Sequence, residues 1–137
     1  MPEERDSLIH MAKGVRYIHS KDLVHRDIKP ENVLIYVKEK VLLKISDFGC
    51  SKQSRDGVFS MSSQISGTQN YLAPEILSLI DSNESPLGIT MTNASDVFAL
   101  GCTFFMFLTR GTHPFGQGFS IAPNILAGKS NLESWFT

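Results

Sequence analysis

The sequence is poor in cysteine and has no long hydrophobic run. Cys50 and Cys102 are the two cysteines among 137 residues, and their spacing fits neither a zinc site nor a disulfide framework. Two isolated thiols are typical of a protein in a reducing compartment. The first six residues are polar and acidic, unlike a secretory signal peptide. The longest apolar run, residues 97–108, is too short to cross a bilayer and predicts a buried core helix.

A strong charge of either sign is also missing. The chain has 13 Lys and Arg against 14 Asp and Glu, for a formal net charge of -1. This balance gives no electrostatic reason to expect nucleic acid or an anionic membrane as a partner. The length is normal for one domain, and the 42% hydrophobic content is enough for a core.

Hydrophobic spacing predicts a helix and a hairpin in the first third of the chain. Apolar residues recur at helical spacing at Leu8, Met11, Ala12, Val15 and Ile18. They predict an amphipathic helix over about residues 6–20. The β-prone runs Val33–Val37 and Val41–Ile45, separated by three polar residues, predict a small hairpin. Residues 47–72 are rich in serine, glycine and glutamine without a sustained period, which predicts a long functional loop.

Three further helices are predicted in the rest of the chain. A short helix should follow Pro74, because proline suits the first turn of a helix. Either Ser95 or Asp96 is a candidate to cap the next helix, which should run to about residue 109. A weak helix is predicted around residues 123–127.

Polar motifs occupy the loops between these elements. Residues 25–32 read His-Arg-Asp-Ile-Lys-Pro-Glu-Asn, residues 47–49 read Asp-Phe-Gly, and the long loop ends with Gly67-Thr68 followed by Ala-Pro-Glu at 73–75. Each short motif alone is weak, because such tripeptides occur by chance. Their shared order, with a helix before and a hairpin between, makes chance a poor explanation. In this combination the chain resembles the catalytic loop, metal-binding turn and activation-segment end of the protein kinases.

The resemblance implies a fold and an activity. The fold is the C-terminal, large lobe of a protein kinase, mainly α with a small β-hairpin, with residues 1–137 forming a partial kinase domain. The implied activity is transfer of the ATP γ-phosphate to protein hydroxyls, with Mg²⁺ as the metal. Lys29 and Thr68, in their sequence contexts, are similar to the serine/threonine branch. The implied partners are ATP and a protein substrate, with dimerisation of a full-length parent as a further expectation.

The same resemblance assigns roles near the catalytic loop. Asp27 is expected to accept the proton of the substrate hydroxyl, and Lys29 to lie beside the transferring phosphate of ATP. Asn32 and Asp47 are expected to supply oxygen ligands to magnesium. Arg26 could be a solvated charge or an anchor for a phosphate on the long loop, and the resemblance favours the anchor.

Other residues are expected to support the site. His25 should pack rather than react, and Glu75 should pair with an arginine that this chain does not contain. Thr68 is expected on the substrate side, in contact with the catalytic aspartate and lysine. Asp96 could be only a helix cap, but the resemblance favours a buried carboxylate that holds the catalytic-loop backbone.

The closing region is similar to one kinase subfamily. Residues 111–116, Gly-Thr-His-Pro-Phe-Gly, and residues 124–128, Asn-Ile-Leu-Ala-Gly, resemble the stress-sensor kinases of the endoplasmic reticulum that carry an attached endoribonuclease. Ser60 and Ser63 stand where phosphoserines of that subfamily would fall, although serine-rich loops are commonplace. The implied location is cytoplasmic, or the cytosolic face of a membrane.

Two kinase motifs are missing from the sequence. Neither a glycine-rich phosphate loop nor a Val-Ala-Ile-Lys-like strand precedes the catalytic loop. We therefore expect the N-terminal lobe to be absent and this polypeptide alone to have negligible kinase activity. The alternative is a truncated, catalytically inactive kinase-like binding module. His10 and His19 face no obvious cluster in the sequence and are predicted to be structural.

Overall fold

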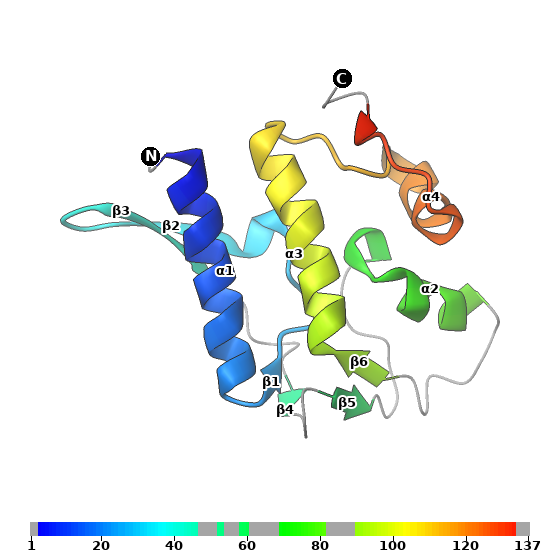
Figure 1. The fold of residues 1–137 in the computed structure, drawn as a ribbon, viewed down its shortest axis with the longest axis horizontal. Helices are drawn as coiled ribbons and strands as arrows, with labels where there is room; N and C mark the ends of the chain where they lie inside the picture. The colour runs from blue at the N-terminus through cyan, green and yellow to red at the C-terminus, as the bar shows by residue number, and fades with distance from the viewer. Residues whose placement is uncertain (1–2, 47–51, 54–57, 61–68, 82–89, 134–137) are drawn as a thin grey trace.

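The computed structural model describes residues 3–46, 52–53, 58–60, 69–81 and 90–133 (Figure 1). Its helices are α1 (Glu4–Ser20), α2 (Pro74–Asp81), α3 (Asn93–Leu108) and α4 (Ile121–Ala127). Short 3-10 turns are η1 (Pro30–Asn32), η3 (Gln69–Tyr71) and η4 (Gly118–Ser120). The strands form antiparallel pairs: β1 (Leu23–Val24) with β4 (Lys52–Gln53), β2 (Val33–Val37) with β3 (Val41–Ile45), and β5 (Val58–Ser60) with β6 (Thr90–Thr92).

The predicted fold class, mainly helical with a small β-hairpin, is confirmed. Helix α1 begins at Glu4 rather than residue 6, and α4 begins at Ile121 rather than residue 123. The hairpin has the predicted bounds. The long loop predicted over residues 47–72 was wrong in part, because it contains β4, β5 and η3. These strands are two or three residues long and pair with distant segments, so they leave no local pattern.

Helix α3 lies at the centre of the molecule. Figure 1 shows it between α1 on one side and α2 with α4 on the other. One core fills the α1 side and contains Met11, Val15, Ile28, Leu43, Ala99 and Leu100. The second core fills the α2 and α4 side and contains Val24, Leu72, Ala73, Ile76, Leu77, Met91, Ile121 and Ile125. Val24 belongs to one core and Ile28 to the other, so the segment between them is held at both ends by burial.

The start of α3 corrects the predicted cap. Thr92 is the N-cap, and its Oγ1 accepts the Ser95 backbone N–H at 3.3 Å. Ser95 Oγ in turn accepts the Thr92 backbone N–H at 3.1 Å, which completes a capping box. Neither Ser95 nor Asp96 is therefore the N-cap. Asp96 lies one residue beyond the box, in the first helical turn, and is 1% exposed.

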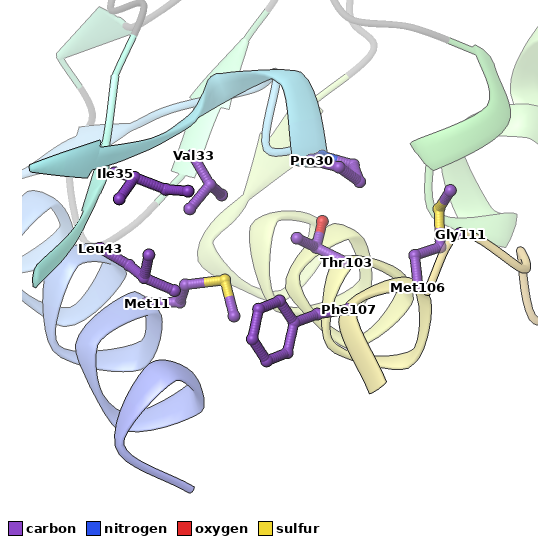
Figure 2. A pocket seen from close by; sticks show the side chains of 9 residues that line it. All are labelled: Met11, Pro30, Val33, Ile35, Leu43, Thr103, Met106, Phe107 and Gly111. Carbon is purple, nitrogen blue, oxygen red and sulfur yellow. The ribbon is translucent and has the colours of Figure 1, made fainter. Parts of the chain in front are cut away.

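The hairpin packs one face against α1. A Cβ on Gly14 of α1 would lie 3.0 Å from Ile45 Cγ1, so glycine allows helix and strand to approach closely. A groove of about 250 Å³ remains between α1, the hairpin and α3 (Figure 2). It is lined by Met11, Pro30, Val33, Ile35, Leu43, Thr103, Met106, Phe107 and Gly111. The Thr103 hydroxyl donates to the Ala99 carbonyl at 2.9 Å within α3, so the groove presents mainly apolar atoms.

Among the described helices, none combines the length and the apolar character that a bilayer crossing requires.

Candidate active site

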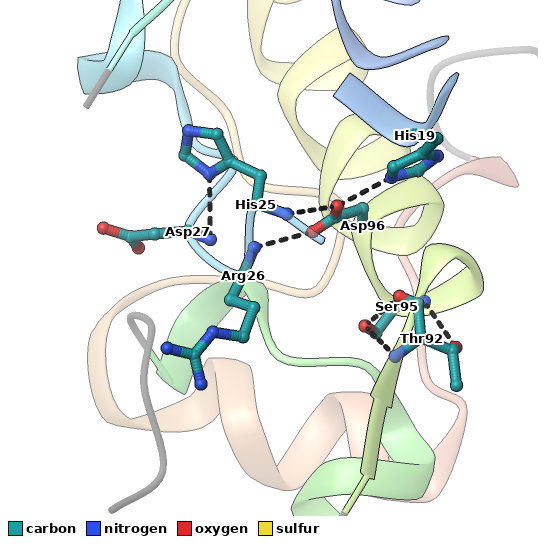
Figure 3. Close-up of polar contacts among 7 residues, drawn as sticks. All are labelled: His19, His25, Arg26, Asp27, Thr92, Ser95 and Asp96. Atoms are coloured by element: carbon teal, nitrogen blue, oxygen red, sulfur yellow. Dashed lines mark hydrogen bonds and ion pairs between the residues drawn. The ribbon is translucent and has the colours of Figure 1, made fainter. Parts of the chain in front are cut away.

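One buried carboxylate holds the backbone of the His-Arg-Asp segment (Figure 3). Asp96 Oδ2 accepts the His25 backbone N–H at 2.8 Å, and Oδ1 accepts the Arg26 backbone N–H at 2.9 Å. Arg26 has φ of 72°, a left-handed conformation that costs a non-glycine residue about 1 kcal/mol. The two charge-assisted hydrogen bonds offset this cost. Figure 3 shows the Arg26 and Asp27 side chains pointing away from Asp96 as a result.

A third contact to Asp96 was missed by the sequence analysis. His19 Nε2 lies 2.8 Å from Asp96 Oδ2, at the end of α1. The contact has a structural role, as predicted for His19, but the sequence did not indicate its partner. The two residues are 77 positions apart, so no local pattern could have paired them. His10 also has a structural contact: its Nδ1 accepts the Leu43 backbone N–H at 3.3 Å.

His25 joins the His-Arg-Asp segment to the end of β3. Its Nδ1 accepts the Asp27 backbone N–H at 3.1 Å, and its Nε2 lies 2.8 Å from the Ser46 carbonyl oxygen. An N–H must donate and a carbonyl must accept, so the ring is neutral with its proton on Nε2. The side chain is fully buried. His25 therefore packs between the two segments and fixes the distance between Asp27 and Ser46.

Three polar side chains meet on the loop after His25. Lys29 Nζ lies 3.6 Å from Asp27 Oδ2. Asn32 Nδ2 donates to the Asp27 carbonyl at 2.7 Å and lies 3.4 Å from Asp27 Oδ2. Pro30 begins the 3-10 turn η1, and this turn brings Asn32 back toward Asp27. The result is a carboxylate that has an ammonium within ion-pair distance and an amide within hydrogen-bonding distance.

The Asn32 position is held from a second side. The Ser46 backbone N–H donates to the Asn32 carbonyl at 2.7 Å, and Ser46 Oγ donates to the same oxygen at 3.0 Å. Because Ser46 follows β3 and Asn32 precedes β2, the hairpin returns the chain to the His-Arg-Asp segment. The structure therefore brings the residue before Asp47 next to Asn32.

The remaining candidates are placed only in part. Asp47, Ser63 and Thr68 lie outside the described residues, and for Ser60 the structure describes only the backbone, in β5. Glu75 is exposed in the first turn of α2. Within the described ranges, no three His, Cys, Asp or Glu side chains lie close enough to hold a metal ion. The predicted ligand pair of Asn32 and Asp47 is not tested by that observation, because Asp47 is outside those ranges.

Tyr71 is a neighbour of this loop that the sequence analysis missed. Together with Arg26, Asp27 and Asp96 it lines a small cavity. Its hydroxyl donates to the Met106 sulfur at 3.3 Å. Burial, with smaller contributions from Glu31 and Cys102, raises the pKa of Tyr71 to about 12. Tyr71 is therefore a neutral, packed phenol beside Asp27 rather than a proton carrier.

Comparison with known proteins places this geometry in a family. The model of the protein kinase domain matches residues 2–130. The sensor for unfolded proteins in the ER from Schizosaccharomyces pombe is 39% identical, over 88% of this chain and 13% of the relative. A serine/threonine-protein kinase/endoribonuclease is 37% identical in Caenorhabditis elegans (93% of this chain, 13% of the relative). Another serine/threonine-protein kinase/endoribonuclease, from Homo sapiens, is 40% identical over 88% of this chain and 13% of the relative.

These relatives agree with the resemblance to endoplasmic-reticulum stress-sensor kinases seen in residues 111–116 and 124–128. The chain spans 13% of the length of each of the three relatives, so it corresponds to one part of them. The match to the domain model covers more than half of the chain and includes the whole loop that Asp96 and His25 hold. The chain belongs to the protein kinase family.

Proposed function

We propose that this chain is the catalytic-loop part of a protein serine/threonine kinase, which transfers the γ-phosphate of ATP to serine or threonine hydroxyls of a protein. The convergence of Asp27, Lys29 and Asn32 on one rigid loop carries the proposal. Phosphoryl transfer needs positioning and charge neutralisation more than covalent chemistry from the protein. A loop with a carboxylate, an ammonium and an amide fits that need.

In this proposal Asp27 orients the substrate hydroxyl and accepts its proton. Its side chain is 12% exposed, so it can reach a substrate while the protein limits its freedom. The Lys29 ammonium, 3.6 Å from Asp27 Oδ2, stabilises the negative charge on the transferring phosphoryl group. Both groups belong to a backbone that Asp96 and His25 hold in position, so little reorganisation is needed at the moment of transfer.

Asn32 is the proposed magnesium ligand on this loop. Its Nδ2 is used in the contact with the Asp27 carbonyl, which leaves Oδ1 as the amide atom to bind a cation. An amide oxygen is a suitable ligand for magnesium, and Asp47 is the proposed second ligand. When bound, magnesium supplies neutralisation of phosphate oxygens. Asn32 then has two tasks, since one end of the amide orients Asp27 and the other faces the metal.

The hairpin next to Asn32 supports a nucleotide site. Leu34 and Tyr36, which alternate onto the same face of β2, are 53% and 41% exposed. Large exposed hydrophobic side chains that share one face mark a surface that is covered by a partner or ligand. We propose that, in a longer polypeptide, the nucleotide and a lid formed by another part of the chain cover this face. The relatives are long enough to contain such a lid, because this chain spans 13% of their length.

Regulation and location follow as further proposals. Ser60 and Ser63 are the proposed phosphorylation sites of the activation loop, and Arg26 is the proposed anchor for the added phosphate. Phosphopeptide mapping of the full-length protein under activating conditions tests the two serines. Finding neither serine phosphorylated would refute this proposal.

The full-length parent is proposed to act in the cytoplasm or on the cytosolic face of a membrane, and to dimerise.

Labelled phosphate transfer to dephosphorylated casein, with ATP and magnesium, tests the main proposal. The 137-residue chain should show no transfer, while the longer polypeptide with its nucleotide lid should transfer phosphate. Asp27→Asn should abolish that transfer, because the amide cannot accept the proton. Asp6→Asn, a matched change of an exposed carboxylate in α1, should leave it intact.

Transfer that survives Asp27→Asn would refute the assigned mechanism. A longer polypeptide that binds kinase partners but neither binds ATP nor transfers phosphate would support the binding-module alternative.

A further inference from the structure

The Gly-Thr-His-Pro-Phe-Gly segment after α3 contains a buried histidine with two backbone contacts. His113 is 5% exposed. Its Nε2 lies 2.8 Å from the Asn70 carbonyl oxygen, and its Nδ1 accepts the Phe115 backbone N–H at 3.1 Å. The carbonyl can only accept and the N–H can only donate, so His113 is neutral with its proton on Nε2. The ring therefore ties the turn after α3 to the 3-10 turn η3.

Aromatic packing strengthens the same connection. The rings of His113 and Tyr71 are tilted by 55°, with centroids 5.4 Å apart, and the His113 and Phe115 centroids are 6.1 Å apart. The centroid distance between His113 and Tyr71 is in the usual range for aromatic contacts. Because Tyr71 also contacts Met106 of α3, η3 is attached to the end of α3 through two side chains.

The turn that carries His113 is itself braced on both sides. Thr109 Oγ1 accepts the Thr112 backbone N–H at 3.1 Å. On the other side, Asn124 Nδ2 of α4 donates to the Phe115 carbonyl at 2.8 Å. Because these contacts hold the turn in place, the His113 ring is held in place too. The ring can therefore fix the position of the Asn70 carbonyl, to which it is hydrogen-bonded.

The held segment has a place next to the proposed catalytic site. Tyr71 lines the small cavity that also contains Asp27. Asn70 and Tyr71 line an open hollow of about 300 Å³ as well, together with Thr112, His113, Gln117 and Gly118. Tyr71 thus connects the hollow to the catalytic loop. The chain has no Asp, Glu, Lys or Arg between Gly111 and Gly128, so this side of the hollow suits an uncharged polypeptide segment.

We propose that His113 is a positioning residue, which holds the Asn70 carbonyl and so sets the wall on which an extended, uncharged segment of the protein substrate lies. The inference rests on the proposed kinase function and adds the substrate side of the site. His113 does not touch the reacting atoms. It acts through Asn70 and Tyr71, and its loss should weaken the use of protein substrate without changing the use of ATP.

Two substitutions distinguish the hydrogen bond made by Nε2 from the one made by Nδ1. His113→Gln places an amide N–H near the position of Nε2 and can keep the bond to Asn70. His113→Asn places its amide near Nδ1, so it can keep the Phe115 contact but loses Asn70. His10→Gln is the matched control, because His10 also binds a backbone N–H but lies on α1 beside β3. Each change is made in the longer polypeptide that transfers phosphate.

The measurement is the KM for dephosphorylated casein and for ATP, with kcat. His113→Asn should raise the KM for casein about threefold to tenfold, the effect of one lost neutral hydrogen bond. The KM for ATP and kcat should stay within about twofold. His113→Gln and His10→Gln should leave all three values near those of the unchanged protein. In the same proteins, amide hydrogen exchange at residues 70–72 should be faster only in His113→Asn.

Two results would overturn the inference. One is an unchanged KM for casein in His113→Asn together with unchanged exchange at residues 70–72. The other is an equal effect of His113→Asn and His113→Gln, because the bond to Asn70 would then not be the cause. If the unchanged protein transfers no phosphate, the kinase proposal fails, and with it the substrate role of His113. The exchange measurement would then show whether the attachment of His113 to Asn70 exists without that role.

Discussion

Asp96 holds the backbone of Arg26, although 70 positions separate the two residues in the chain. The Oδ1–N distance is 2.9 Å, and Arg26 has the left-handed φ of 72° that turns its N–H toward the carboxylate. The next residue is Asp27. The direction in which Asp27 faces is thus decided by a side chain on the central helix.

The first prediction concerns the charge of Asp96. Asp96→Asn keeps the shape but leaves one of the two backbone N–H groups facing an NH₂ group. We expect a loss of about 3 kcal/mol in the free energy of unfolding, because a buried N–H is left without an acceptor. Urea unfolding measures it. Asp6→Asn, on the exposed face of α1, should change stability by less than about 0.5 kcal/mol, and equal effects of the two substitutions would contradict the assignment.

The second prediction concerns the pair formed by His19 and Asp96. His19→Phe removes the 2.8 Å contact and leaves the carboxylate with its two backbone partners. Alone it should cost about 1 kcal/mol of unfolding free energy. In a double-mutant cycle with Asp96→Asn, the combined loss should be smaller than the sum by about 1 kcal/mol, since the two residues share one interaction. Simple additivity would show that the contact contributes nothing.

A third prediction separates the amide of Asn32 from the loop around it. In the longer polypeptide, Asn32→Ala should lower phosphate transfer about 100-fold and raise the magnesium concentration needed for half-maximal rate. The cause is loss of both the Asp27 contact and the proposed ligand oxygen. Ser46→Ala removes a hydroxyl contact to the Asn32 carbonyl but keeps the amide, so its transfer rate should stay within about threefold. Normal magnesium dependence in Asn32→Ala would argue against the ligand role.

A fourth prediction concerns Cys102 in α3. The thiol is 3% exposed, and burial raises its pKa to about 12. Since the thiolate is the reactive form, alkylation by iodoacetamide at neutral pH should be very slow in the folded protein and rapid in denaturant. Mass spectrometry of the peptide that contains Cys102 measures this separately from Cys50. Fast labelling of Cys102 without denaturant would mean that this part of the core opens.

The fifth prediction is the dependence of stability on pH through His113. Burial lowers its pKa below the ordinary 6.5, against a smaller opposing effect of the Asn70 carbonyl. The unfolded chain then binds more protons than the folded one in the range between the lowered pKa and 6.5. The contribution of neutral His113 is therefore complete above pH 6.5 and is lost as pH falls from 6.5 through the lowered value.

Urea unfolding over this pH range, compared with His113→Gln, isolates the effect. The stability difference between the unchanged protein and the variant should shrink as the solution becomes more acidic. A difference that is constant or grows toward acid pH would contradict a lowered pKa for His113.

Local patterns in the sequence determined much of this protein. The spacing of Met11, Val15 and Ile18 specified α1, because a helical face must be apolar to be buried. Two β-prone runs around a polar turn specified the hairpin and its bounds, since neighbouring strands pair through a short connection. The order of the catalytic-loop and Asp-Phe-Gly motifs was enough to indicate the kinase family, which the domain match then showed.

Only the tertiary structure decided which distant residues meet. His19 and Asp96, or His113 and Asn70, come together because α3 packs between two cores and brings its ends against segments far away in the chain. The choice of Thr92 over Ser95 and Asp96 as the cap depended on where the packed helix begins, and that position left Asp96 free to turn inward. A sequence pattern reports the periodicity of one element, whereas such contacts depend on the relative positions of several. The polar residues of this site were therefore visible in the sequence, but the bonds that aim Asp27 were not.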